Sequence, residues 1–92
     1  MNYNNIKSLK LKVVIVESIL LSCIVTGSIL ELLFKIQTVL PLSYGVLKNY
    51  LFYLVDYNFI SYNGQKQVYI TEERGLDLLY MIKKEKKMKM VE

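Results

Sequence analysis

The sequence contains no histidine, no tryptophan and only one cysteine among its 92 residues. A single cysteine excludes a disulfide within the chain, and without histidine the ligand sets that zinc prefers are missing. The cysteine, Cys23, lies in an apolar run, where we expect a buried small hydrophobe rather than a reactive thiol. These absences predict a protein without a metal site, and we expect no cofactor.

Catalytic groups are equally scarce. The acid–base candidates are the eight aspartate and glutamate residues, and no spacing among them indicates a paired-carboxylate site. No pattern indicates an activated nucleophile, and no glycine-rich loop follows a strand to hold a phosphate. The sequence therefore predicts a binding protein and not an enzyme.

The charge balance is mildly basic. Twelve basic and eight acidic residues give a net charge of +4, which suits an acidic partner such as nucleic acid or an anionic membrane surface. Five of the basic residues fall within 83–92, where we expect a solvated helix end that complements the helix dipole. The length fits one small domain. We divide the chain into a flexible N-terminus over 1–8, a domain over 9–82 and a lysine-rich end over 83–92.

Residues 13–34 form the most apolar run of the chain. As one helix they would extend about 33 Å, which is enough to cross a bilayer. Two carboxylates, Glu17 and Glu31, interrupt the run, and the stretch between them is too short to span. A membrane-anchored protein that spans through this run is therefore an alternative and not the first expectation.

A helix break inside this run is the preferred interpretation. Gly27 is a candidate for a left-handed residue that ends one helix. Ser28 and Glu31 have the spacing of a capping box that begins another. The sequence predicts two helices, near 9–25 and 29–37.

A helix-turn-helix pattern follows. Pro41 disfavours helix at the residue before it, and Ser43 is a good helix N-cap. Leu42 and Leu47 are spaced as a hydrophobic staple around this cap. The apolar spacing then predicts a third helix over 44–57, joined to the preceding helix by a tight turn.

Two short apolar segments, 59–62 and 67–70, flank a turn sequence and predict a β-hairpin. The turn contains Asn63 and Gly64, a pair that accepts positive φ at both positions. Two registers stay open. A two-residue turn puts Phe59 on one face with Val68 and Ile70, whereas a three-residue loop puts Ile60 there instead.

A last helix is predicted to begin at Thr71, with two glutamates at the positive end of its dipole. Its apolar stripe stops at Lys83 and consists of Leu76, Leu79 and Ile82. The expected fold class is mainly α with a β-hairpin (α+β). The expected architecture is a winged helix-turn-helix in the order α-α-α-β-β-α.

Particular residues connect this pattern to a known family. They are Ile36, Leu42-Ser43-Tyr44, Leu47, Tyr50-Leu51, Leu54, Phe59-Ile60, Ile70-Thr71-Glu72, Arg74-Gly75 and Leu79. In these positions residues 36–79, about half of the chain, resemble the small archaeal winged-helix DNA-binding proteins, a group of regulators and chromatin-associated dimers. The Leu-Ser-Tyr opening and the Ile-Thr-Glu-x-Arg-Gly exit are the most specific parts of the resemblance.

The resemblance implies a cytoplasmic dimer that binds double-stranded DNA in transcription regulation or DNA packaging. The third helix would enter the major groove, and the hairpin would follow the backbone as a wing. By position, the groove-facing candidates are Ser43, Tyr44, Gly45, Lys48 and Asn49, and the wing candidates are Gln65 and Lys66. The lysine-rich end would add backbone contacts.

The chain departs from the family on the third helix. The family usually places several lysines or arginines there, whereas Lys48 is the only one in this sequence. Phe52 stands where a polar residue is usual, and Gly45 where a long basic side chain is common. A helix with one cation gains little from counterion release.

The first helix predicts a partner surface. Apolar residues cover nearly its whole circumference, which a domain this small cannot bury alone. A homodimer is the simplest explanation. The expected interface residues are Val13, Val16, Leu20, Leu21 and Ile24. A rival interpretation uses the winged helix for protein–protein contact, for which the aromatic residues Tyr44, Phe52 and Tyr53 are suited.

Overall fold

The structure is a computed structural model that describes residues 11–25 and 27–91, with side chains to residue 88. The flexible terminus expected over 1–8 lies outside the described residues. Within them the chain forms four helices and one antiparallel hairpin in the order α-α-α-β-β-α, which confirms the expected fold class. The elements are α2 (Val13–Ser22), α3 (Ile29–Gln37), α4 (Tyr44–Asp56), β1 (Ile60–Asn63), β2 (Val68–Thr71) and α5 (Glu73–Val91).

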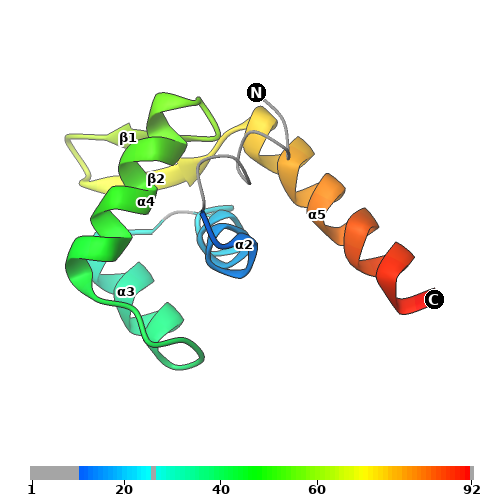
Figure 1. Ribbon diagram of the computed structural model, residues 1–92. Helices are drawn as coiled ribbons and strands as arrows, with labels where there is room; N and C mark the ends of the chain where they lie inside the picture. Colours follow the sequence, from blue (N-terminus) through cyan, green and yellow to red (C-terminus); the bar gives the residue numbers. More distant parts are fainter. Residues whose placement is uncertain (1–10, 26, 92) are drawn as a thin grey trace.

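The helices are arranged around α2. Figure 1 shows α3, α4 and the hairpin on one side of α2 and α5 on the other. Because α2 is covered from two sides, Val16, Ile19 and Leu20 have no exposed surface within the single chain. These side chains are the centre of the hydrophobic core, to which α3, α4, α5 and the hairpin all contribute.

The break between the first two helices is confirmed. α2 ends at Ser22, three residues earlier than expected, and α3 has the expected bounds. The Ser28 hydroxyl accepts the Glu31 backbone N–H at 3.3 Å, and the Glu31 carboxylate accepts the Ser28 N–H. This reciprocal capping box satisfies two of the orphan donors of α3. Among the described residues, no helix combines the length and the apolarity that a bilayer crossing requires.

The expected role of Gly27 is wrong. None of the described glycines has a positive φ, so Gly27 does not end a helix in a left-handed conformation. Instead it is extended against β2: its N–H donates to the Tyr69 carbonyl at 3.0 Å and its carbonyl accepts the Tyr69 N–H at 2.7 Å. The segment between α2 and α3 therefore adds a single antiparallel bridge to the edge of the hairpin.

The helix-turn-helix is formed by α3 and α4. The Ser43 hydroxyl accepts the Val46 N–H at 3.2 Å and caps α4 as expected. Leu42 and Leu47, the two residues of the expected staple, are both buried. The Tyr50 hydroxyl accepts the Lys12 backbone N–H at 2.9 Å, which ties α4 to the start of α2.

The hairpin loop is longer than either expected turn, but the pairing keeps the side-chain alternation of the two-residue alternative, with Ser61 and Asn63 opposite Ile70 and Val68. Asn63 pairs with Val68, so the connecting loop has four residues, 64–67. The Asn63 side-chain oxygen accepts the backbone N–H groups of Gln65 and Lys66 at 3.0 and 3.1 Å. The only positive φ in the loop is at Gln67. The Asn-Gly pair therefore makes a side-chain-stabilised turn rather than a tight two-residue one.

The start of α5 also differs from the expectation. Thr71 ends β2, and its buried hydroxyl donates to the Leu20 carbonyl at 2.7 Å instead of capping the helix. Leu76 was expected on the buried stripe but is 46% exposed, while Leu78, Leu79 and Ile82 are buried. Gly75 lies close to the Phe59 carbonyl and the Thr71 side chain, so the buried stripe of α5 runs through Gly75, Leu78, Leu79 and Ile82 and leaves Leu76 beside it.

Candidate nucleic-acid interface

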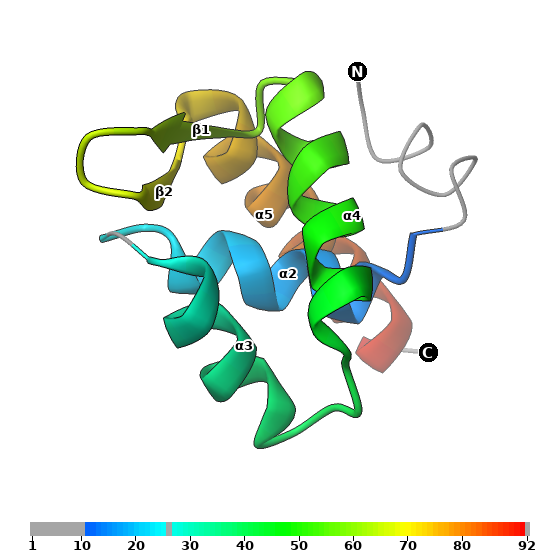
Figure 2. The ribbon, with the colours of Figure 1, turned by 90° about the vertical axis from the view of Figure 1, so that its left-hand side faces the viewer.

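The outer face of α4 is open in the described structure. Figure 2 shows α4 at the front of the molecule, with the hairpin beside its upper part, α3 beside its lower part and α5 behind α2. Leu47, Tyr50, Leu51 and Leu54 point into the core. The opposite face carries Gly45, Lys48, Asn49, Phe52 and Asp56, all of which are exposed. Their spacing of three and four residues makes one continuous stripe along the helix.

The N-terminal end of α4 contributes a cation and a ring. The Lys48 ammonium lies 5.7 Å from the centre of the Tyr44 ring, a cation–π contact between residues one turn apart. A Cβ atom added at Gly45 would meet no atom within 4 Å, so this position leaves the backbone of α4 accessible. The N–H groups at this end favour an anion such as phosphate.

The wing residues lie in the hairpin loop. Gln65 and Lys66 are both exposed, and only their backbone N–H groups are bound, by Asn63. Their side chains are therefore available to a partner.

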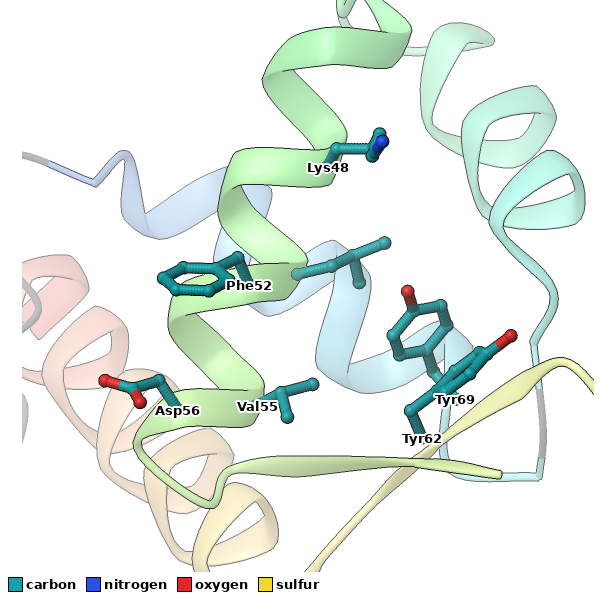
Figure 3. Close-up of a pocket in the computed structure, with 7 residues that line it drawn as sticks. Lys48, Phe52, Val55, Asp56, Tyr62 and Tyr69 are labelled. Atoms are coloured by element: carbon teal, nitrogen blue, oxygen red, sulfur yellow. The ribbon is translucent and has the colours of Figure 1, made fainter. Parts of the chain in front are cut away.

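A hollow of about 340 Å³ separates α4 from the hairpin. Its lining is mainly apolar and consists of Lys48, Leu51, Phe52, Val55, Asp56, Tyr62 and Tyr69. In Figure 3, Lys48 and Val55 point from α4 toward the two tyrosines of the hairpin, while Phe52 and Asp56 project away from them. The rings of Tyr62 and Tyr69 pack at 4.8 Å between centres. Burial, with a smaller effect of Tyr62, raises the pKa of Tyr69 above its ordinary value.

A second hollow adjoins the first. Lys48, Tyr62 and Tyr69 line both, and the second one extends to Tyr44 and to the start of α3. α4 and the hairpin therefore share one concave surface, with Lys48 in both of its parts. The sequence predicts Lys48 and the hairpin as parts of two different elements. In the folded chain, Lys48 and the hairpin tyrosines line the same hollows.

The sequence prediction missed the two tyrosines. Tyr62 and Tyr69 are directly paired across the strands, so they meet on the same face of the hairpin. Their pairing follows from the register, and the register follows from the four-residue loop. Neither the two-residue turn nor the three-residue loop considered from the sequence pairs Tyr62 directly with Tyr69.

Positive charge is sparse on this surface. α4 carries Lys48 and, at its other end, Asp56, while Lys66 is in the wing loop. The lysine-rich end lies across α2 from α4, as Figures 1 and 2 both show. The body of the domain separates the described part of this end from α4, so the proposal below assigns the DNA contacts to α4 and the hairpin loop.

The expected dimer residues have different environments. Val16 and Leu20 are completely buried within the single chain, so they offer no surface to a partner. Val13 is partly buried, whereas Leu21 and Ile24 are 43% and 48% exposed. The single chain covers α2 from two sides, with α5 on one side and α3, α4 and the hairpin on the other. Part of the surface expected to meet a second subunit is therefore buried within one chain.

Cys23 is fully buried, and burial raises the pKa of its thiol to about 12. A thiol that stays protonated at neutral pH is a poor nucleophile, which agrees with the expected role as a small hydrophobe.

Comparison of the chain with models of protein families, with curated proteins and with solved structures found no match.

Proposed function

We propose that this protein binds double-stranded DNA by inserting α4 into the major groove, and that it acts as a dimer in transcription regulation or DNA packaging in the cytoplasm. The observation that supports this function is the uncovered stripe of α4 beside the hairpin loop. The stripe runs from Gly45 to Asp56 with no other described element over it. A single helix fits the width of the major groove, and a hairpin beside it reaches the flanking backbone.

The residues of the stripe have distinct roles in this proposal. The N-terminus of α4 and Lys48 contact phosphates, and the Asn49 amide is free to pair with the edge of an adenine. Gln65 and Lys66 contact the backbone beside the groove. Asp56 lies at the C-terminal end of the stripe, where it repels phosphate and keeps that end of α4 away from the backbone.

One subunit offers few cations to the DNA, so the proposed affinity depends on a dimer. Each phosphate neutralised contributes about 0.9 to the slope of log affinity against log salt. Lys48 and Lys66 alone therefore support a slope of about 2 for one subunit, which corresponds to weak binding. Two subunits on paired half-sites would double the number of contacts. The exposed aliphatic residues Leu21 and Ile24, with their exposed neighbours Val14 and Val25, are the proposed dimer surface.

The proposal is tested by fluorescence anisotropy with a labelled duplex at low salt. Saturable binding that weakens steadily as salt is added is the expected result. If the protein binds no duplex at low salt, the DNA-binding function is rejected.

A second candidate function is supported by one observation. Phe52 is 68% exposed at the edge of a mainly apolar hollow, which suits an apolar side chain of another protein. In that case α4 and the wing form a protein–protein contact site without DNA binding. The anisotropy experiment distinguishes the two candidates, because only the first requires affinity for a bare duplex.

A further inference from the structure

Phe52 occupies the middle of the α4 stripe. Phe52 is 68% exposed, and its ring lies edge-on to that of Tyr53 at 5.7 Å between ring centres. Lys48 lies one turn before it, and Asn49 lies three residues before it on the same face. With this stripe inserted into a major groove, as proposed above, Phe52 at its middle faces the edges of the base pairs.

The major groove offers an aromatic ring one suitable surface. Guanine, cytosine and adenine present only hydrogen-bond donors and acceptors there, while thymine also presents its C5-methyl group. A ring placed over polar edges removes their water and returns no hydrogen bond, which costs affinity. A ring placed over a thymine methyl buries apolar surface on both sides.

Asn49, exposed on the same face of α4, suits the same type of base pair. An asparagine amide pairs bidentately with the N6 and N7 atoms of adenine, the partner of thymine. The neighbouring positions of Asn49 and Phe52 on α4 thus match the two features that distinguish an A·T pair in the major groove. Lys48 contacts the Tyr44 ring near the N-terminus of α4, the end of the stripe that is proposed to contact DNA phosphates.

We propose that the protein selects A·T-rich duplexes, with Phe52 packed on thymine methyl groups and Asn49 paired with adenine. This inference rests on the proposed insertion of α4 into the major groove. It assigns a specificity role to a residue that adds no charge and no hydrogen bond.

The test compares two duplexes of alternating A and T, one of which has deoxyuridine in place of every thymidine. Uracil keeps every hydrogen-bonding group of thymine and lacks only the methyl, so the two duplexes differ in that group. The wild-type protein is expected to bind the thymidine duplex about fourfold more tightly for each methyl group that it buries. Both are expected to bind more tightly than a G·C duplex.

Two variants identify the side chain that reads the methyl. Phe52→Ala is expected to bind the thymidine and deoxyuridine duplexes equally. Tyr80→Ala is the matched control, because Tyr80 is also 68% exposed but lies on α5, across α2 from α4. This variant is expected to keep the full preference. Since both rings are exposed, neither substitution removes a buried side chain, and circular dichroism verifies that both variants are folded.

The outcomes separate this inference from the proposed function. Equal binding of the wild-type protein to both duplexes overturns the methyl-reading role but leaves DNA binding intact. Loss of the preference in Tyr80→Ala, or its retention in Phe52→Ala, also overturns the assignment to Phe52. If the wild-type protein binds no duplex at all, the proposed function fails and the inference fails with it.

Discussion

The ammonium group of Lys86 on α5 donates a hydrogen bond to the Glu17 carboxylate on α2, across 69 positions of the chain and at a distance of 2.5 Å. The Glu17 side chain is 11% exposed and that of Lys86 is 56% exposed. This ion pair explains how a carboxylate is accommodated in the most apolar run of the sequence. It also attaches α5 to α2, so Lys86 stabilises the fold and is not free to bind an acidic partner.

Removing this ammonium leaves the Glu17 carboxylate buried without its partner. Lys86→Met is expected to lower the free energy of unfolding by about 1–2 kcal/mol. This is less than the loss of about 3–5 kcal/mol for a fully buried pair, because Lys86 is half exposed and solvent screens the interaction. Urea unfolding followed by circular dichroism measures the change. Lys87→Met, which removes an exposed lysine of the same helix, is the control, and equal stability of the two variants would contradict the role of the pair.

The two cations beside the open face of α4 are expected to determine the salt dependence of DNA binding. Replacing Lys48 and Lys66 by alanine together is expected to weaken binding and to lower the slope of log affinity against log salt by about 1 for each lysine. Anisotropy titrations at several salt concentrations measure this slope. Lys87→Ala removes one charge from α5 on the far side of α2 and is expected to leave the slope unchanged. Unchanged binding in the double variant would mean that another surface contacts DNA.

Adding a cation to the same face is expected to have the opposite effect. Gly45 has space for a side chain, since a Cβ there meets no atom within 4 Å. Gly45→Lys is therefore expected to fold and to raise the salt slope by about 1 through one more phosphate contact. Tyr80→Lys, which places the same charge on α5, is expected to increase affinity far less. Equal gains in the two variants would indicate a general charge effect and not a contact at α4.

The two glycines at helix starts are expected to respond differently to alanine. A Cβ on Gly75 would lie 2.2 Å from the Phe59 carbonyl oxygen and 2.7 Å from the Thr71 methyl carbon. The backbone of α5 must then move, so Gly75→Ala is expected to lower stability by about 1–3 kcal/mol or more. Gly45→Ala meets no obstacle and is expected to raise stability by up to about 1 kcal/mol, because alanine favours the helix. Thermal unfolding measures both changes, and a stable Gly75→Ala variant would contradict the packing described for α5.

The proposed dimer makes a simple prediction about mass in solution. Light scattering at micromolar concentration is expected to give the mass of two chains. Leu21→Glu and Ile24→Glu each place a charge on the proposed dimer surface and are expected to give the mass of one chain. Val39→Glu, at an exposed aliphatic residue after α3, is the control and is expected to leave the dimer intact. A wild-type monomer under these conditions would remove the dimer from the proposal.

The sequence by itself determined the features that depend on residues within one helical turn of each other. The capping box of Ser28 and Glu31, the cap at Ser43 and the apolar spacing of α4 each involve positions three or four residues apart. Such contacts form whenever the local segment becomes helical, so their residue types are sufficient to predict them. The order of helices and strands follows from signals of this local kind.

Only the tertiary structure decided the contacts between distant parts of the chain. The bridge from Gly27 to Tyr69 and the ion pair from Glu17 to Lys86 join residues more than 40 positions apart. Whether a face of α2 meets α5 or a second subunit depends on how closely the helices pack, and here Gly75 allows the close approach. No local preference encodes these pairings, because each one depends on the shape of the whole core. The position of the open α4 stripe beside the hairpin loop, which the proposed function uses, is of this second kind.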